Sequence, residues 1–184
     1  HKHYMLKEIF EQPERLRDTI GQGAAGDEAF GPAAAAVFPH VAAVQILACG
    51  TSYHAGLVAK HWIESLAGLP CQVEVASEFR YRDSVTLPNT LVVGISQSGE
   101  TADTIAALRM AKSSAMETIA VVNSENSTMA READIILPIR AGIEVGVAST
   151  KAFTAQLLVL AAMVLEAARQ RKKINPKQEE QFIN

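Results

Sequence analysis

The 184-residue sequence contains only two cysteines, Cys49 and Cys71. Two cysteines cannot build the dense disulfide framework of small secreted domains, and both lie in apolar runs that we interpret as buried strands. We expect reduced thiols packed as small hydrophobic groups, since neither has a basic neighbour in the sequence that would activate a nucleophile. No signal peptide is visible in the charged N-terminal stretch. These features favour a cytoplasmic location.

An excess of positive charge is also missing. Lysine and arginine together number 17 against 20 acidic residues, and the formal net charge is −3. The basic footprint of a nucleic-acid-binding protein is therefore not expected, and the charge of any anionic ligand must be met locally. The His, Cys, Asp and Glu residues show no metal-ligand spacing, so we expect neither a metal nor another cofactor.

No apolar run is long enough to cross a membrane. The strongest candidate, residues 152–165, lies between Lys151 and Glu166 and contains Thr154 and Gln156. A membrane-spanning helix needs about 20 consecutive apolar residues. We therefore interpret this stretch as a buried or interfacial helix and expect no membrane partner.

From residue 41 onward, apolar runs alternate with helical patterns. The expected strands are residues 41–49, 71–76, 91–95, 118–122 and 134–139, and the expected helical pieces are residues 53–67, 77–82, 101–110, 127–131 and 151–172. Strands that read as nearly continuous apolar runs indicate a parallel sheet with helices on both faces. The sequence predicts an α/β fold of three layers around a five-stranded parallel sheet.

Three segments divide the chain. Residues 1–40 are expected to be a helical lead-in and connection, with a helix over 4–20 broken near Pro13, a connection over 21–32 and a short Ala-rich helix ending at Phe38. Residues 41–172 form the α/β domain, and residues 173–184 begin a linker.

The most informative stretch is residues 96–101, which read SQSGET between an expected strand and an expected helix. The start of a helix carries about half a positive charge and unpaired N–H donors, so it suits an anion such as phosphate. Gly99 allows close backbone approach or a positive φ. The alternative is that Ser98 or Thr101 simply caps the helix, although the four polar side chains Ser96, Gln97, Ser98 and Thr101 exceed what a cap needs. Glu100 argues slightly against an anion there, unless it points to water.

A second hydroxyl turn, Gly50-Thr51-Ser52, follows the first expected strand. In a sheet of strand order 2-1-3-4-5, the first and third strands are neighbours and flank the topological switch point. Ligands of such sheets bind beyond the carboxyl ends of the strands at that point. We therefore expect the two turns to converge on one crevice.

Five segments then resemble one family in order and spacing. They are YMLKEIFEQP at 4–13, CGTS at 49–52, ASEFRYR at 76–82, SQSGETADT at 96–104 and GVASTKAFT at 146–154. Together they resemble the first sugar-isomerase (SIS) domain of the glutamine:fructose-6-phosphate aminotransferase (isomerising) family, also called glucosamine-6-phosphate synthases. The resemblance covers nearly the whole chain and implies a flavodoxin-like SIS fold that binds a hexose 6-phosphate.

The resemblance also implies roles for single residues. It assigns Ser52, Ser96, Gln97, Ser98 and Thr101 to the phosphate, Thr51 to the phosphate or sugar neighbourhood, and Val147 and Ser149 to the sugar end. Gly99, Glu144 and Lys151 are further candidates. A carboxylate at position 144 could orient a sugar hydroxyl or a base, or it could cap a helix.

The family's full enzyme also has an N-terminal amidotransferase domain and a second SIS domain, and it is a homodimer. The resemblance places the isomerisation base, the ring-opening histidine and the Schiff-base lysine in that second domain or in a neighbouring subunit. We therefore expect no catalytic residue in this chain, which would bind a sugar phosphate without converting it. The alternatives are a sugar-phosphate-sensing regulatory module and a structural dimerisation unit.

Overall fold

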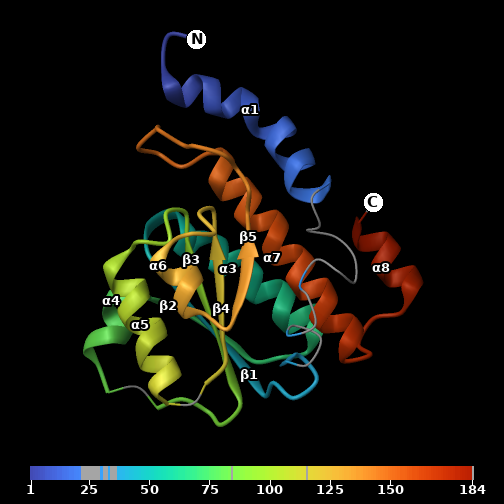
Figure 1. Cartoon of the computed structure of the whole chain (residues 1–184). Coiled ribbons are helices and arrows are strands. Elements are labelled where there is room, and N and C mark those ends of the chain that lie inside the picture. Colours follow the sequence, from blue (N-terminus) through green and yellow to red (C-terminus); the bar gives the residue numbers. More distant parts are fainter. Residues whose placement is uncertain (22–29, 31–32, 34–36, 84, 115, 184) are drawn as a thin grey trace.

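The computed structural model describes residues 1–21, 30, 33, 37–83, 85–114 and 116–183. A five-stranded parallel sheet with the strand order β2-β1-β3-β4-β5 forms its centre (Figure 1). The strands are β1 (Ala43–Ala48), β2 (Cys71–Val75), β3 (Thr90–Ser96), β4 (Thr118–Val122) and β5 (Ile135–Pro138). The predicted strands and their order are confirmed, with small differences at the strand ends.

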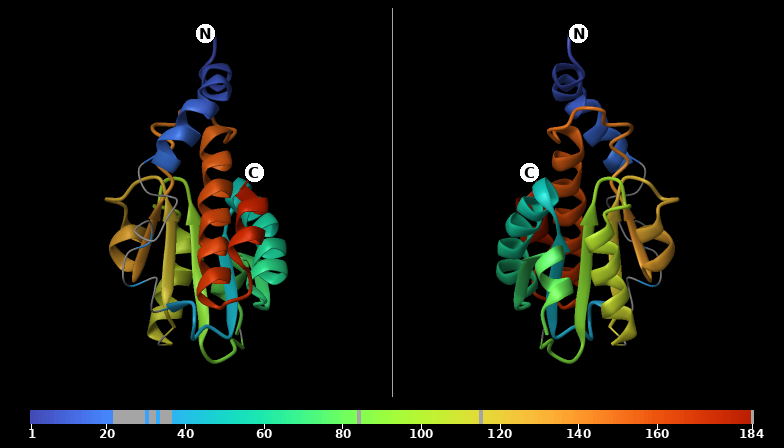
Figure 2. Two further views of the ribbon diagram at one scale, coloured as in Figure 1. Left: turned by 90° about the vertical axis from the view of Figure 1, so that its right-hand side faces the viewer. Right: turned by 90° about the vertical axis from the view of Figure 1, so that its left-hand side faces the viewer.

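Helices cover both faces of this sheet, as Figure 2 shows. One face carries α3 (Gly50–Trp62), the π-helical turn η2 (Ile63–Ala67) and α7 (Lys151–Gln170); the other carries α4 (Ala76–Tyr81), α5 (Ala102–Ser113) and α6 (Thr128–Glu132). Neighbouring residues of β1 point to opposite faces, so Ile46 joins the core beneath α3 and α7 while Leu47 joins the core beneath α5 and α6. Every residue of β1, β3 and β4 is buried. The predicted three-layer α/β fold is therefore confirmed.

Helix α7 contains the apolar stretch considered above as a membrane candidate. Its length and composition would allow it to cross a membrane, but more than half of its most apolar window is buried inside the domain. Ala155, Val159, Leu160 and Met163 lie in the core against the sheet. Its apolar character thus matches the predicted core helix of a globular domain.

Helix α1 (Tyr4–Thr19) runs without interruption through Pro13, so the predicted break there is wrong. Proline cannot donate to the carbonyl four residues earlier, which here belongs to Ile9. The side-chain amide of Gln12 donates to that oxygen at 3.2 Å instead. The helix therefore continues because a neighbouring side chain replaces the missing backbone donor.

Helix α8 (Pro176–Ile183) lies within the segment predicted to begin a linker. The rings of Phe182 and Trp62 pack edge to face with their centroids 6.3 Å apart, which places α8 beside α3. At the other end of the chain, most of the predicted connection over 21–32 and most of the Ala-rich helix lie outside the described residues.

Candidate functional site

The two hydroxyl turns meet at the carboxyl ends of β1 and β3. Ala48 of β1 is paired with Ile95 of β3, so the residues that follow them leave the sheet side by side. Together with the loop before α7 they enclose a pocket of about 240 Å³. Its lining contains all eight predicted ligand-binding residues, Thr51, Ser52, Ser96, Gln97, Ser98, Thr101, Val147 and Ser149, together with Cys49, Ile95, Glu144 and Gly146. The predicted convergence is confirmed.

Two helices begin at this pocket, α3 at Gly50 and α5 at Ala102. The first N–H groups of a helix have no partner within it and carry a partial positive charge. Neither N-cap residue, Cys49 or Thr101, makes a side-chain capping hydrogen bond. Ser98 accepts from the N–H of Glu100, which precedes α5. The simple capping role considered for Ser98 and Thr101 is therefore wrong, and both helix ends remain available to an anion.

The hydroxyl groups of the 96–101 turn form a small network. Ser96 Oγ accepts from the N–H of Gly99 at 3.1 Å and lies 2.9 Å from Thr101 Oγ1, where either atom can donate. One of the two hydroxyl groups donates its proton to the other. The second hydroxyl group accepts this bond and does not use its own proton in it. Since both side chains line the pocket, that proton can be offered to an acceptor bound there.

Ser52 is oriented from across the domain. The amide Nε2 of Gln156, a buried residue of α7, donates to Ser52 Oγ at 3.0 Å. A serine oxygen that accepts this bond keeps its own proton free to donate elsewhere. Gln156 was not among the predicted site residues, although an amide within a largely apolar helix was a usable signal. The residue fixes one of the predicted phosphate ligands.

Glu144 reaches the pocket but is heavily engaged by its own loop. Its carboxylate accepts from Ser149 Oγ at 2.9 Å and from the backbone N–H groups of Thr150 and Ala152 at 2.9 and 3.2 Å. These bonds cap the start of α7 and match the capping alternative. The carboxylate also holds the Ser149 side chain in place.

Lys151 does not line the pocket. It is buried, and its ammonium donates to Glu11 of α1 at 2.6 Å. This hydrogen bond, followed by one from Lys7, lowers the pKa of the Glu11 carboxyl. The structure therefore separates Lys151 from the other candidates and places it in the contact between α1 and α7.

Gly99 has a φ of +68° and serves a close backbone approach rather than lining the pocket. A Cβ at this position would lie 2.1 Å from Ser127 Oγ. The Gly99 carbonyl accepts from the N–H of Met129 in α6. The glycine thus lets the 96–101 turn lie directly against the start of α6.

Glu100 lies against the start of α6 and does not belong to the pocket lining. Its carboxylate accepts from the backbone N–H of Thr128 at 2.8 Å, at the start of α6. The hydrogen bond from the Thr128 backbone, ahead of that from its side chain, lowers the pKa of Glu100 below its ordinary value. The residue therefore does not place its charge in the pocket, and it binds α6 rather than simply pointing to water.

This lowered pKa gives a testable pH dependence. A carboxyl whose pKa is lower in the folded state stabilises the protein when the pH is above the ordinary pKa of 4.5. This contribution disappears as the pH falls through the folded-state pKa. We predict that Glu100→Gln loses less stability than the wild type when the pH drops below that value. Urea denaturation at a series of pH values measures this, and parallel curves for the two proteins would contradict the assignment.

The two cysteines differ in position. Cys71 is buried at the start of β2, and burial raises the pKa of its thiol to about 12. Cys49 is not in a buried strand as predicted, because β1 ends one residue earlier and Cys49 is the half-buried N-cap residue of α3, where it lines the pocket. Both are free thiols.

Several polar residues near the two turns lie outside the pocket lining. His54 is exposed on α3 beside the ring of Tyr53. Arg82 pairs with Glu74 of β2, and Arg80 of α4 pairs with Asp103 of α5 at 3.0 Å. Surface ion pairs of this kind fit a solvated face rather than chemistry. Within the described residues, no group of three or more potential metal ligands is found.

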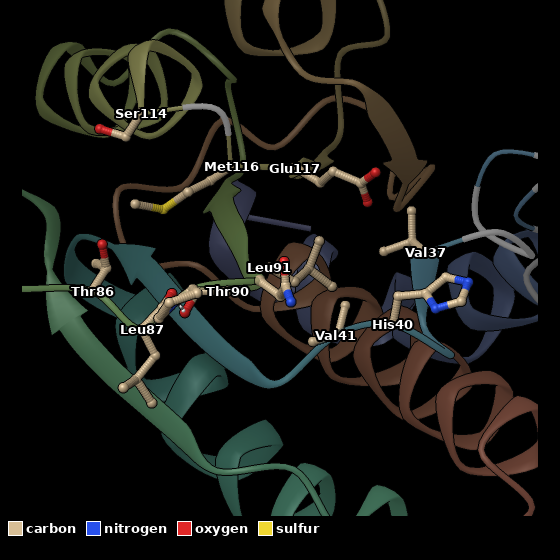
Figure 3. Close-up of a pocket in the computed structure, with 12 residues that line it drawn as sticks. Val37, His40, Val41, Thr86, Leu87, Thr90, Leu91, Ser114, Met116 and Glu117 are labelled. Atoms are coloured by element: carbon tan, nitrogen blue, oxygen red, sulfur yellow. Dashed lines mark hydrogen bonds between the residues drawn. The ribbon is translucent and has the colours of Figure 1, made fainter.

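A second hollow, of about 420 Å³, lies at the opposite end of the sheet (Figure 3). Its lining includes His40 and Val41 before β1, Leu87 and Thr90 at the start of β3, and Glu117 before β4. These residues belong to the amino ends of the strands, and none of the described lining residues is the first residue of one of the helices named above. The pocket at the carboxyl ends is therefore the better candidate for an anionic ligand.

Fold and pocket together define a doubly wound α/β domain with a crevice at its switch point, where two helix starts and several hydroxyl groups meet. A family model described as "SIS domain" matches residues 40–166, and the chain belongs to this family. The chain is 52% identical over its whole length to glutamine–fructose-6-phosphate aminotransferase (isomerizing) of Pseudomonas syringae pv. tomato, and 55% identical over 93% of its length to that of Pseudomonas putida. It spans 31% and 29% of these relatives.

A solved structure supports the same relationship. The C-terminal domain of glucosamine-fructose-6-phosphate aminotransferase from Francisella tularensis superposes on the whole chain with a TM-score of 0.94 and 45% identity, and 54% of that chain is covered. The resemblance read from the five sequence segments is thus confirmed, and the chain corresponds to a single SIS domain of such proteins.

Proposed function

We propose that the pocket binds a hexose 6-phosphate, such as fructose 6-phosphate or glucosamine 6-phosphate. In this proposal Ser52, Ser96, Gln97, Ser98 and Thr101 hold the phosphate, Thr51 lies beside it, and Val147 and Ser149 face the sugar. The supporting observation is the meeting of two helix starts and several hydroxyl groups in one pocket. No Lys or Arg belongs to the described lining, so N–H and O–H donors must carry phosphate recognition.

The proposed role is positional. In the reaction that the family resemblance implies, an opened ketose 6-phosphate meets ammonia, a C2 imine forms, and a proton moves from C1 to C2. Binding the remote phosphate fixes the distance of C1 and C2 from the base that moves this proton. We propose that this domain supplies the anchor and no catalytic residue. Turnover of fructose 6-phosphate and ammonia by the purified chain would overturn that part of the proposal.

We also propose the wider setting that the family resemblance implies. It comprises an amidotransferase domain and a second SIS domain in the longer protein, a homodimer, and a cytoplasmic location. The chain covers under a third of the curated relatives, so these features concern a larger protein.

Calorimetry with two ligands distinguishes this proposal from its alternatives. Binding of fructose 6-phosphate and glucosamine 6-phosphate supports the anchor, and preference for an unrelated sugar phosphate favours a sensor module. Absence of binding at millimolar ligand leaves only the dimerisation unit. That last alternative relied on the apolar face of α7, much of which is buried in the domain's own core.

The double substitution Ser98→Ala and Thr101→Ala tests the phosphate assignment directly. It removes two hydroxyl groups from the pocket. We predict a loss of about 1 to 3 kcal/mol in sugar-phosphate affinity, the scale of hydrogen bonds to a charged group. Unchanged affinity in a folded variant, with folding checked by thermal denaturation, contradicts the assignment.

A further inference from the structure

The loop at the sugar side of the pocket is held by a carboxylate from α1. Glu8 is 2% exposed, and its Oε1 accepts from the backbone N–H of Val145 at 2.6 Å. Its two oxygens also lie 3.3 and 3.1 Å from the N–H of Gly146. One buried carboxylate thus binds two successive backbone donors of a loop more than a hundred residues away in sequence.

The loop residue beside Glu8 is shaped for this contact. A Cβ on Gly146 would lie 2.5 Å from Glu8 Oε2 and 3.6 Å from the Cα of Met5. Gly146 also lines the pocket, next to Val147. A side chain at position 146 would therefore displace the Glu8 carboxylate from this contact. In Figure 1, α1 lies directly beside the segment that leads into α7.

A second contact from α1 fixes the other end of the same loop. Glu11, one helical turn after Glu8, accepts from the buried ammonium of Lys151 at 2.6 Å. Lys151 is the first residue of α7 and follows the loop. Helix α1 thus holds the loop at both ends, at residues 145–146 and at residue 151.

The 96–101 turn, which carries most of the proposed phosphate ligands, is held by elements other than α1. Its hydrogen bonds are internal, between Ser96, Gly99 and Thr101, or run to α6 through Gly99 and Glu100. The carbonyl of Gln97 also accepts from the backbone N–H of Asn123, which follows β4. In the part of the chain that the structure describes, no hydrogen bond links α1 to this turn. Changes in α1 should therefore move the sugar side of the pocket and leave the phosphate side in place.

We propose that Glu8 is a positioning residue that sets the selectivity of the pocket for a sugar phosphate over free phosphate. It acts through the loop, by presenting Val147 and Ser149 to the sugar, and makes no contact with the ligand itself. The selectivity claim rests on the function proposed above. The loop-holding claim rests on the geometry alone.

The experiment compares Glu8→Ala and Glu8→Gln with a control, Glu14→Ala, which removes an exposed carboxylate from the same helix. Calorimetry measures the Kd of fructose 6-phosphate and of inorganic phosphate. Amide hydrogen exchange followed by NMR reports separately on Val145 and Gly146. For Glu8→Ala we expect the fructose 6-phosphate Kd to rise about tenfold, faster exchange at both amides, and a phosphate Kd within about twofold of the wild type. Glu8→Gln keeps one acceptor oxygen but brings an NH2 group toward the loop. Its fructose 6-phosphate Kd and amide exchange rates should therefore lie between those of the wild type and Glu8→Ala.

The outcomes separate the two levels of the proposal. Loss of sugar-phosphate affinity with unchanged phosphate affinity supports it, whereas an equal loss for both ligands indicates only a structural role and overturns it. If the wild type binds neither ligand, the proposed function fails, and exchange alone decides the loop-holding claim. Faster exchange at Val145 and Gly146 then supports that claim, and unchanged exchange overturns it.

Discussion

Replacing Gly99 with alanine should lower the free energy of unfolding by about 2 to 5 kcal/mol, the sum of a left-handed backbone penalty and of overpacking. The φ at this position is +68°, and the new Cβ would lie 2.1 Å from Ser127 Oγ and 2.5 Å from its Cβ. Relief of the overlap requires the turn to separate from α6. Because the same turn carries Ser96, Ser98 and Thr101, we expect ligand binding to fall with stability. Urea denaturation and calorimetry measure the two effects.

Two further variants separate the overlap from the backbone penalty. Gly142 has a similar φ of +71°, but its nearest neighbour would be 3.8 Å from an added Cβ, so Gly142→Ala should cost only about 1 to 2 kcal/mol. Adding Ser127→Gly to Gly99→Ala removes the overlapping atoms and should restore part of the stability. Equal costs for Gly99→Ala and Gly142→Ala, or no rescue by Ser127→Gly, would show that the contact with Ser127 is unimportant.

The sheet and the 96–101 turn could be predicted because their determinants are local in sequence. Five apolar runs separated by helical patterns indicate a parallel sheet, and its switch point follows from the strand order. The SQSGET turn lies between a strand and a helix, so its position at the carboxyl end of the sheet follows without any long-range contact. The strand-turn-helix pattern therefore predicted correctly that the hydroxyl turn follows the carboxyl end of β3.

The supporting side chains could not be predicted because their partners are distant. Gln156 reaches Ser52 from α7, Glu8 reaches Val145 from α1, and Lys151 turns away from the pocket to Glu11. Each contact depends on how helices pack on the sheet, which periodicity alone does not specify. A polar residue within an apolar helix indicates that some partner exists, without indicating which one.

The break predicted at Pro13 failed for a local reason. Proline disfavours a helix interior because its ring crowds the carbonyl four residues earlier and because that carbonyl loses its backbone donor. In α1 the side chain of Gln12 donates to the Ile9 carbonyl, so the helix continues and carries Glu8 and Glu11 on one rigid element. The continuity of α1 is what allows its two carboxylates to hold both ends of the pocket loop.

Arg171 provides the second large effect, at the opposite end of the domain from the pocket. Its guanidinium donates to the carbonyls of Ala67 at 3.2 Å, Phe38 at 3.2 Å and Val41 at 2.9 Å. It thereby joins the end of α7 to the end of the π-helical turn and to the segment that enters β1. Arg171→Met keeps much of the side-chain length but leaves three carbonyls without this donor, and we predict a loss of about 2 to 5 kcal/mol in unfolding free energy.

Comparison with two other variants tests this reasoning. Arg171→Lys keeps the charge but lacks the planar fork that reaches separate carbonyls, so its loss should be intermediate. Lys177→Met, on the exposed side of α8, should change stability by less than about 0.5 kcal/mol. Because β1 is anchored here but presents Thr51 and Ser52 at its other end, folded Arg171→Met should bind fructose 6-phosphate with wild-type affinity. Weaker binding by Arg171→Met without loss of stability would mean that this end of the sheet affects the pocket. Gly99→Ala, by contrast, should lower ligand affinity and the free energy of unfolding together.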